Sequence, residues 1–352
     1  MKSIRILIVE DSPIFIDVLR SAVEAEFDME VVAVAENGQQ AVELCVALRP
    51  DLVLMDIQMP VLDGLEATEV IMADCPTPIL VVTSDPFHGG VDQSFRALSA
   101  GALDLIAKPT EVPWPDVSRR DFVRKIRLLS QVPVVRHMRG RRAARAHMAT
   151  PRLGRVTPSG SVVGVVASTG GPKALARLVA DLDVNFPAPI LVVQHIMPGF
   201  SEHLAQWLDR SGPLSVVEAR NGMRLEPGIV YIAPAESHLE LGANLVLRTH
   251  DEPAIGGHRP SGDLLLESIA RYAGSRAIGV VMSGMGSDGT LGLAAIKRAG
   301  GATFVQDRET SVVYGMPQSA IDLGVVEQVV KLEEIARILL NRASVGELPD
   351  EP

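Results

Sequence analysis

Three residues in the second half of the chain, Ser168, His195 and Asp288, could together hydrolyse an ester or an amide. They lie in VVASTGGPKAL, LVVQHIMPGF and VVMSGMGSDGTLG, each behind an apolar run that is typical of a buried strand. A serine that attacks an acyl group needs a base to take its proton and a carboxylate to orient that base. The expected chemistry is acyl transfer through a serine, provided that the three loops meet.

Each of these residues also has an ordinary structural explanation. Ser168 does not lie in a G-x-S-x-G elbow, because Val166 occupies the first glycine position. A serine between a strand and a helix equally well caps the helix or belongs to a glycine turn that cradles phosphate. A single histidine at a strand end, such as His195, is more often structural than catalytic. These residues by themselves leave the role of Ser168 open.

A second chemistry competes for the loop around the aspartate. Gly284, Gly286 and Gly289 satisfy G-x-G-x-x-G after a predicted strand, and Asp307 follows about 20 residues later, as in a dinucleotide-binding turn. Two observations argue against a cofactor site: the pattern falls late in its domain, and it leaves Ser168 and His195 without a role. The glycines alone do not separate a cofactor loop from a hydrolase loop.

The first half of the chain carries a different set of residues, suited to phosphoryl transfer. Glu10 and Asp11 follow the first predicted strand and Asp56 follows the third, so the carboxylates meet at one edge of a parallel sheet. Such a cluster suits Mg²⁺, which prefers oxygen ligands and can bridge the cluster to a phosphoryl group on Asp56. Thr83 and Lys108 end the next two predicted strands and could bind phosphoryl oxygens.

Taken singly, these residues have simpler explanations. Asp11 could merely cap a helix that begins near Pro13, and Lys108 could be a solvated loop residue. Asp63 and Gly64 favour a turn beside the acidic cluster. Only their joint occurrence at successive strand ends favours a phosphoacceptor site.

Predicted strands and helices, which must position these acidic residues, alternate over residues 1–130. Short apolar runs separated by helix-period segments predict βα units and a doubly wound parallel sheet. The predicted strands are Ile4–Val9, Glu30–Ala35, Asp51–Met55, Ile79–Val82 and Asp104–Ala107. The predicted helices are Pro13–Glu26, Gly38–Leu48, Leu65–Ala73, Ser94–Ala100 and Trp114–Ser130.

Residues 161–345 resume this alternation and predict a second, doubly wound and mainly parallel α/β domain. Within them, three short strands separated by turns predict a small antiparallel extension: Val230–Ala233, His238–Leu241 and Leu245–Arg248. The other predicted strands are Ser161–Ala167, Ile190–His195, Ala277–Ser283, Thr303–Gln306 and Val325–Val329.

Composition limits the class of protein. With 352 residues, 47% of them hydrophobic, and a net charge of −10, the chain is long enough for two globular domains and is not a generic nucleic-acid binder. No signal peptide or membrane span is expected, which predicts a cytoplasmic protein without membrane insertion. Cys45 and Cys75 lack metal-ligand or disulfide patterns, so we expect reduced core thiols.

The segment between the two predicted domains, residues 131–160, is rich in arginine and has no acidic residue. This composition predicts a solvated tether between a domain of residues 1–130 and one of residues 161–345. The alternatives are a docking segment for an acidic partner surface and an arginine-rich arm that binds nucleic acid.

The first domain resembles the two-component receiver domain over residues 1–130, on the motifs LIVEDS, LVLMDIQMPVLDG, VVTS and IAKP in that order. The resemblance implies a flavodoxin-like (βα)5 fold in which Asp56 accepts phosphate from a histidine kinase. Glu10 and Asp11 would hold Mg²⁺ together with Asp56. Thr83 and Lys108 would contact the phosphoryl group.

The second domain resembles the catalytic domain of the chemotaxis protein-glutamate methylesterases, the CheB family. The motifs that carry the resemblance are ASTGGP, QHIMPGF, YIAPAESHLEL, HRPSGDLLLESIA, GVVMSGMGSDGTLG and TFVQDRETSVVYGMP. By this resemblance Ser168 is the nucleophile, His195 the general base and Asp288 its orienting carboxylate. The Met285 amide would belong to the oxyanion hole, with Thr169 flanking the site.

The family resemblance also implies an activity and its partners. The expected reaction is hydrolysis of glutamyl γ-methyl esters on the cytoplasmic helices of methylated chemoreceptors, with glutamine deamidation in some members. It would give adaptation in chemotaxis-type signalling. A chemotaxis histidine kinase would be the phosphodonor, and the esterase chemistry would need no cofactor. We expect the chain to act as a monomer.

Control by phosphorylation follows as a hypothesis from the receiver lying on the same chain. The unphosphorylated receiver would cover the catalytic cleft, and phosphorylation of Asp56 would loosen that packing. A response regulator whose second half only binds a ligand or a partner is the alternative from a different class.

Overall fold

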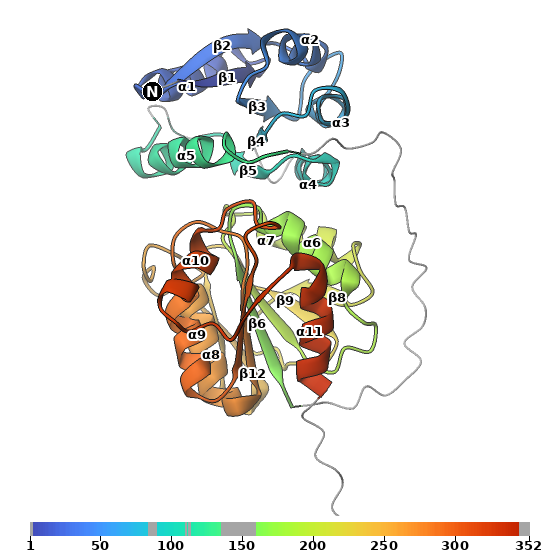
Figure 1. The fold of residues 1–352 in the computed structure, drawn as a ribbon, viewed down its shortest axis with the longest axis vertical. Coiled ribbons are helices and arrows are strands. Elements are labelled where there is room, and N and C mark those ends of the chain that lie inside the picture. Colours follow the sequence, from blue (N-terminus) through green and yellow to red (C-terminus); the bar gives the residue numbers. More distant parts are fainter. Residues whose placement is uncertain (1–2, 84–89, 110, 112–113, 135–159, 345–352) are drawn as a thin grey trace, which may run out of the picture. The chain divides into compact units, whose positions relative to one another are not determined.

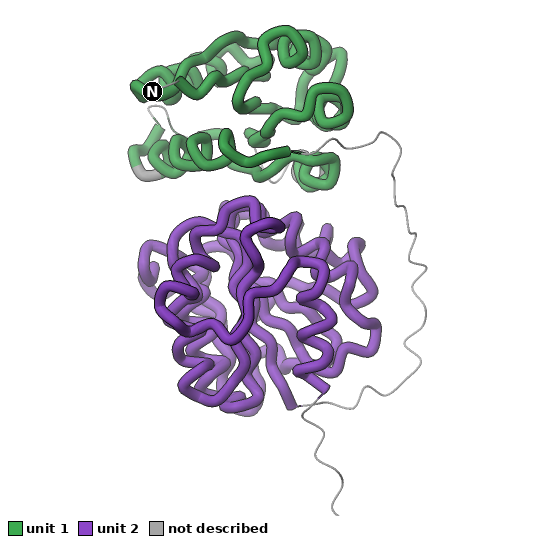
Figure 2. Tube along the Cα trace, in the orientation of Figure 1, with its two compact units in different colours: residues 1–144 green, residues 145–352 purple. Residues whose placement is uncertain are grey.

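The computed structural model describes residues 3–83, 90–109, 111, 114–134 and 160–344. It divides the chain into two compact units, Met1–Ala144 and Arg145–Pro352 (Figure 2). Each unit has its own parallel sheet with helices packed against it (Figure 1). Most of the predicted tether lies outside the described residues, so its role stays a prediction.

The first unit is a five-stranded parallel sheet with the strand order β2-β1-β3-β4-β5. This is the flavodoxin-like order of a doubly wound sheet, as predicted. Helices α1 and α5 contact each other, and α2, α3 and α4 pack side by side (Figure 1). The elements are β1 (Ile4–Val9), α1 (Pro13–Glu24), β2 (Met29–Ala35), α2 (Gly38–Leu48), β3 (Leu52–Asp56), α3 (Gly64–Asp74), β4 (Ile79–Thr83), α4 (Gly90–Ala100), β5 (Asp104–Ala107) and α5 (Asp116–Leu129).

The burial of the strands in this unit explains why their positions could be predicted from the sequence. Every residue of β3 and β4 is buried, because helices cover both faces of the sheet, and such strands form continuous apolar runs. All five predicted strands agree with the observed bounds to within one residue.

The second unit is built on a seven-stranded sheet with the order β14-β13-β12-β6-β7-β9-β8, and all its neighbouring strands are parallel. Helices α8, α9 and α10 pack together, as do α6, α7 and α11 (Figure 1). The strands are β6 (Val162–Ala167), β7 (Ile190–Gln194), β8 (Ser215–Glu218), β9 (Ile229–Ile232), β10 (His238–Leu241), β11 (Leu247–His250), β12 (Ala277–Val281), β13 (Ala302–Gln306) and β14 (Gln328–Val330). The α-helices are α6 (Gly171–Asp181), α7 (Ser201–Asp209), α8 (Gly262–Ala273), α9 (Thr290–Arg298), α10 (Gly315–Asp322) and α11 (Leu332–Ser344).

The antiparallel part of this unit is smaller than the sequence predicts. Val230–Ala233 is predicted as part of the antiparallel extension, which is wrong, because β9 pairs in parallel with β7 and β8. The sequence does not reveal β8 at all. Among the strands of the described residues, β10 and β11 alone pair in antiparallel fashion, and they form a separate two-stranded sheet. Strands of four residues are too short for their hydrophobic pattern to reveal direction or partner.

The centre of the larger sheet is its topological switch point. From β6 the chain winds outward through α6 to β7, and from β12 it winds through α9 to β13 on the other side. Ligands of open α/β sheets bind beyond the carboxyl ends of the strands at such a point. Gly164 of β6 lets α8 lie close to the sheet there, since a Cβ at Gly164 would lie 2.4 Å from Leu266 Cδ2.

The sequence predicts that the two cysteines are reduced core thiols and that no segment spans a membrane. Cys45 and Cys75 are both free and buried, which confirms that they are core thiols. The longest described helix, α5, has 14 residues, and no helix in the described residues is long and apolar enough to cross a bilayer.

Candidate active site and phosphoacceptor site

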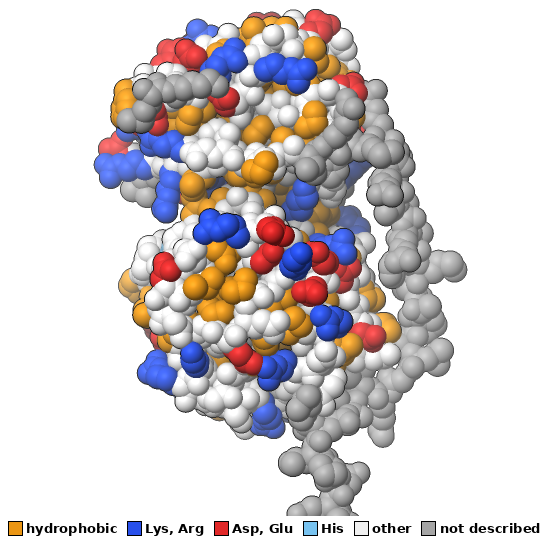
Figure 3. All heavy atoms as spheres, in the orientation of Figure 1, with side chains coloured by type: hydrophobic (Ala, Val, Ile, Leu, Met, Phe, Trp, Pro, Cys, Tyr) orange, Lys and Arg blue, Asp and Glu red, His pale blue; other side chains and the backbone are white. Residues whose placement is uncertain are grey.

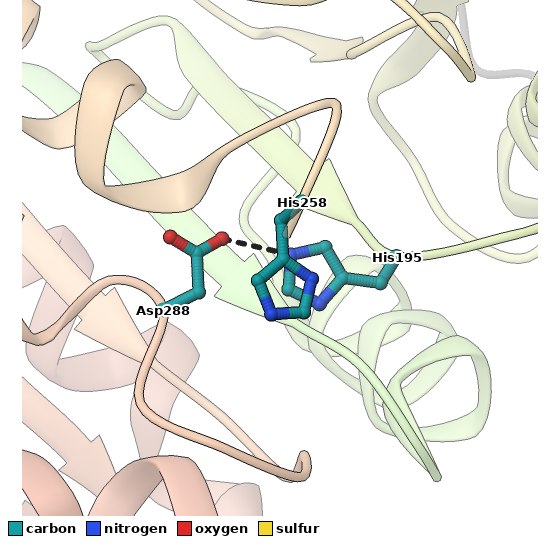
Figure 4. A group of neighbouring side chains, drawn as sticks. All are labelled: His195, His258 and Asp288. Carbon is teal, nitrogen blue, oxygen red and sulfur yellow. Dashed lines mark hydrogen bonds and ion pairs between the residues drawn. The ribbon is translucent and has the colours of Figure 1, made fainter. Parts of the chain in front are cut away.

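A histidine and an aspartate from distant parts of the second unit meet at the switch point. His195 directly follows β7, and Asp288 lies in the loop between β12 and α9. The ring Nε2 of His195 and the Oδ2 of Asp288 are 2.8 Å apart (Figure 4). The Asp288 side chain is almost fully buried, whereas that of His195 keeps 13% of its surface exposed. The imidazole can therefore be reached from solvent while its carboxylate partner cannot.

The N-terminus of α8 holds the carboxylate of Asp288 in place. The backbone N–H groups of Gly262 and Asp263 donate to its two oxygens at 2.6 and 2.9 Å, and the Ser261 hydroxyl donates to Oδ1 at 3.1 Å. Burial alone would raise the pKa of Asp288, but the hydrogen bond and charge of His195 and these backbone donors lower it to about 2. A helix N-terminus also favours a negative charge. Asp288 is thus a fixed, ionised acceptor.

The ionised acceptor fixes the tautomer of His195. A carboxylate only accepts hydrogen bonds. The Nε2 atom must therefore carry the ring proton and donate a hydrogen bond to Asp288. The Nδ1 atom then presents a lone pair, and this buried atom has no hydrogen-bond partner in the structure. A histidine held in this way can accept a proton at Nδ1.

The backbone of Ser168 lies next to that of His195 along the sheet. It follows Ala167, which pairs with Gln194 in register, and His195 N–H donates to the Ala167 carbonyl at 3.0 Å. Ser168 and His195 are therefore the next residues on neighbouring strand ends. The structure contains the imidazole–carboxylate bond of the expected relay but no bond from the Ser168 hydroxyl to Nδ1. Catalytic hydrogen bonds are often loose until a substrate binds.

A buried glutamine joins the two strand ends. The Nε2 of Gln194 donates to the carbonyl oxygens of Ser168 and His195, both at 2.9 Å. The side chain fits because its neighbour Gly171 lacks a Cβ, which would lie 2.0 Å from the Gln194 Oε1. One amide thus ties together the backbones that carry the serine and the histidine.

Ser283, at the end of β12, holds the serine turn from the other side. Its carbonyl accepts the Ser168 N–H at 3.0 Å, and its hydroxyl donates to the Thr169 carbonyl at 2.7 Å. The next residue, Gly284, packs against Ser168, since a Cβ there would lie 2.8 Å from the Ser168 Cβ. The loop that begins with Gly284 and Met285 therefore passes directly beside the serine.

The contacts of Asp307 give no support to a dinucleotide-binding turn in the loop around Asp288. In a dinucleotide site that carboxylate would bind a ribose. Here its Oδ1 accepts hydrogen bonds from the backbone and the hydroxyl of Thr310 in its own loop. Asp288, inside the glycine pattern, is bound to His195. The side chains of this loop therefore favour the hydrolase interpretation.

The acidic residues of the first unit also meet at the carboxyl edge of their sheet. Glu10 and Asp56 are buried and Asp11 is exposed, and one oxygen of each lies within 4.8 Å of the others. Lys108 Nζ is 2.7 Å from Glu10 Oε2 and 3.1 Å from Asp56 Oδ2. Thr83 ends β4, and its carbonyl accepts the Lys108 N–H at 2.7 Å. All five residues predicted for this site therefore lie at one edge.

The charge of this cluster suits a divalent cation. Burial raises the pKa values of Glu10 and Asp56, even though the charge of Lys108 opposes this. Three carboxylates face one ammonium group, which leaves an excess of about two negative charges. All the available donors are oxygens, which hard cations prefer. The residues of this edge therefore fit a hard divalent metal ion.

Several residues that shape the two sites have no signal strong enough to find them from the sequence. Gln194, Ser261 and Ser283 act through hydrogen bonds to residues far along the chain. A weak signal existed for two of them, since Gln194 ends the apolar strand β7 and Ser283 lies two residues after the apolar strand β12. His258 stacks on His195 from an exposed loop, and nothing in the sequence indicates that contact.

The fold and the sites define a class of protein. A flavodoxin-like unit with a buried phosphoacceptor-type carboxylate precedes an α/β unit with a carboxylate-bound histidine at its switch point. This is the organisation of a response regulator with a hydrolase as its output domain.

Comparison with known proteins identifies the family. The family model of the CheB methylesterase matches residues 163–339, and that of the response regulator receiver domain matches residues 6–113. Protein-glutamate methylesterase/protein-glutamine glutaminase 2 of Anaeromyxobacter dehalogenans is 46% identical over 96% of both chains. The Salmonella typhimurium protein-glutamate methylesterase/protein-glutamine glutaminase is 35% identical over 99% of both chains. This chain belongs to the CheB methylesterase family.

A solved structure agrees with this assignment. The catalytic domain of the Thermotoga maritima CheB methylesterase is 41% identical and superposes with a TM-score of 0.51. It covers 52% of this chain and 98% of its own length. The second unit therefore has the fold of that catalytic domain.

The lowered pKa of Asp288 predicts how stability depends on pH. With a folded-state pKa of about 2 against an ordinary 3.8, ionised Asp288 stabilises the unit by about 2 kcal/mol above pH 4, and this is lost as the pH falls through 2. Asp288→Asn should therefore lower the free energy of unfolding at pH 7, with a difference that shrinks below pH 4. Urea unfolding can be followed by Trp207 fluorescence in a Trp114→Phe background.

Asp181→Asn is the matched control for that measurement, since Asp181 pairs with Arg177 at an exposed site of the same unit. Its effect should stay below about 0.5 kcal/mol. A difference for Asp288→Asn that is equally large at pH 3 and pH 7 would contradict the assignment.

The amide of Gln194 predicts an effect on turnover rather than on binding. Gln194→Met keeps the length of the side chain but removes both hydrogen bonds, so the serine and histidine lose their relative placement. We expect kcat for an activated aryl ester to fall roughly 10- to 100-fold, with little change in KM. Gln318→Met, on α10, is the control, because the side chain of Gln318 bonds to the exposed side chains of Arg308 and Asp322. An unchanged kcat for Gln194→Met would show that the amide does not position the site.

Proposed function

We propose that this protein is a phosphorylation-activated protein-glutamate methylesterase, with glutamine deamidase activity, that acts on the cytoplasmic helices of methylated chemoreceptors. The observation that carries the proposal is the His195–Asp288 hydrogen bond beside Ser168 at the switch point. Membership of the CheB methylesterase family supports the substrate class.

The proposed reaction begins at the Ser168 hydroxyl. Its oxygen attacks the γ-carbonyl of a glutamyl methyl ester while Nδ1 of His195 takes the proton. The resulting imidazolium is stabilised by Asp288, which is already ionised and bound to Nε2. The backbone N–H of Met285, in the loop that packs against Ser168, would donate to the developing oxyanion.

The second half of the reaction restores the enzyme. The tetrahedral intermediate collapses, His195 returns its proton to the leaving methoxide, and methanol departs from an acyl-enzyme on Ser168. Water then attacks the acyl group, with its proton passing to His195, and glutamate is released. With a glutamine side chain the same steps release ammonia instead of methanol. Both reactions need only the groups that this unit supplies.

The receiver unit would supply the control. Asp56 would accept a phosphoryl group from a chemotaxis histidine kinase, while Glu10, Asp11 and Asp56 would hold Mg²⁺. The metal ion would neutralise charge between the phosphodonor and the acidic edge. Lys108 already pairs with Asp56 and Glu10, so a phosphoryl group on Asp56 would compete with Glu10 for its ammonium group. Rearrangement of this ion pair would shift the receiver between two states.

The nucleophile assignment predicts a separation of the two activities. Ser168→Ala should abolish methanol release from methylated receptor, because it removes the hydroxyl proposed as nucleophile. Phosphorylation of Asp56 by acetyl phosphate with Mg²⁺ should stay unchanged, because that chemistry lies in the other unit. Methanol and the acid-labile phosphate can be measured on the same preparation. Methanol release by Ser168→Ala at the normal rate would remove Ser168 from this role.

The assignment of Asp56 as phosphoacceptor predicts that regulation can be lost while the basal esterase activity is kept. Asp56→Asn cannot accept phosphate, so it should retain basal methanol release but lose any stimulation by acetyl phosphate. Asp17→Asn, at an exposed position of α1, is the matched control and should be stimulated like the natural sequence. Equal stimulation of Asp56→Asn would place the switch elsewhere. Absence of methanol release under all conditions would instead favour a regulator that only binds its partner.

A further inference from the structure

Two aspartates near the proposed catalytic base lie at the starts of neighbouring helices. Asp288 precedes α9 by two residues, and Asp263 is the second residue of α8. The two helices pack side by side (Figure 1). The proposed reaction uses the carboxylate of Asp288 but assigns no role to that of Asp263, whose backbone N–H donates to Asp288 at 2.9 Å.

Each of these aspartates is bound by the N-terminus of the helix that the other one begins. The carboxylate of Asp288 accepts N–H groups from the first turn of α8. The Oδ1 of Asp263 in turn accepts the N–H of Gly292, in the first turn of α9, at 2.9 Å. The N–H groups of Leu291 and Gly289 also stabilise the ionised form of Asp263 and lower its pKa. The two helices thus bind each other's carboxylates.

Helix α9 has no side-chain cap of its own. Its N-cap is Gly289, which has a φ of 90° and no side chain that could accept the free N–H groups of the first turn. Asp263 fills this role from α8. The close approach requires Gly292, because a Cβ there would lie 2.9 Å from the Asp263 carbonyl oxygen and 2.5 Å from the Leu266 Cβ.

The two carboxylates also repel each other. Burial raises the pKa of Asp263 to about 6, and the charge of Asp288 adds to this rise, although the amides of α9 oppose it. Asp288 has a pKa of about 2, so both groups are mostly ionised at pH 7. Helix N-termini favour negative charge, which offsets this repulsion at both positions. Each carboxylate therefore depends on the helix that carries the other.

We propose that Asp263 is a positioning residue for the loop between β12 and α9. By binding the first turn of α9 it fixes the end of the loop that carries Asp288 and, nearer its start, the Met285 amide. Asp288 then holds the ring of His195 through the bond to Nε2. This inference rests on the proposed function, since the position of the pair affects turnover only if His195 takes the serine proton.

Loss of the Asp263 carboxylate would leave the first N–H groups of α9 without their acceptor. The first turn of α9 would then fray, and Asp288, two residues before it, would lose its fixed position. The His195–Asp288 hydrogen bond would be broken in a fraction of the molecules. The expected effect is on turnover rather than on substrate binding, because Asp263 acts through Asp288.

The test compares three variants of the full chain. Asp263→Ala removes the acceptor, and for an activated aryl ester it should lower kcat roughly 10- to 100-fold while KM changes less than about twofold. Asp263→Asn should recover kcat to within about fivefold of the natural sequence, because Asn caps helices about as well as Asp. Glu267→Ala removes a carboxylate one turn further along α8 and should leave kcat unchanged.

Nuclear magnetic resonance supplies a second readout that needs no substrate. The proton on Nε2 of His195, hydrogen-bonded to Asp288, should give a downfield imidazole N–H signal, which is assigned by its absence from His195→Gln. This signal should broaden or disappear in Asp263→Ala and persist in Asp263→Asn. Because the signal does not depend on hydrolysis, it tests Asp263 even if methanol release is absent, so the two proposals can fail separately.

Three results would overturn the positioning role. These are a natural kcat for Asp263→Ala, a kcat for Asp263→Asn as low as that of Asp263→Ala, and a loss of kcat with the His195 signal unchanged. If the fluorescence of Trp207 shows that Asp263→Ala does not fold, Asp263→Ser replaces it. The shorter serine side chain does not reach the Gly292 N–H, so the same three results decide.

Discussion

The hydrogen bond between His195 and Asp288 is the interaction on which the rest of the catalytic unit depends. It joins the end of β7 to the loop after β12, and the backbone amides at the start of α8 hold its carboxylate. The hydrogen bond and charge of His195, together with those amides, keep the pKa of Asp288 low, and the ionised carboxylate in turn decides which nitrogen of His195 carries the proton. A helix terminus thus helps to hold the carboxylate that fixes the tautomer of a histidine at the end of a different strand.

Both units place their polar groups by the same topological rule. In a parallel sheet every strand ends at the same edge, so residues far apart along the chain meet there without any local motif. The smaller sheet gathers carboxylates and one lysine at that edge, which creates an excess of negative charge. The larger sheet gathers a hydroxyl, an imidazole and a single carboxylate. One fold principle therefore provides both the acidic edge of the receiver and the candidate active-site edge of the hydrolase unit.

Buried polar side chains fix the catalytic edge more tightly than the backbone alone could. Gln194 and Ser283 bond to the turn of Ser168 from the two neighbouring strands, and Gln306 in turn binds the Ser283 N–H. A buried amide or hydroxyl that loses its partner costs about 1–3 kcal/mol, so this network favours one arrangement of the loops. These neutral groups fix the geometry of the site, while the His195–Asp288 pair supplies the proton acceptor of the proposed reaction.

The sequence by itself determined the strands of the receiver, the order of the strand-end motifs and the candidate residues at those strand ends, because local apolar runs and the polar residues after them record these features directly. It did not determine that β9 pairs in parallel, that β8 exists, or that His258 stacks on His195. Nor could it show that Nδ1 of His195 is left without a partner. Each of these depends on contacts between distant segments, whose free energies arise only when the chain has closed on itself, and short strands and glycine turns carry no local pattern for them.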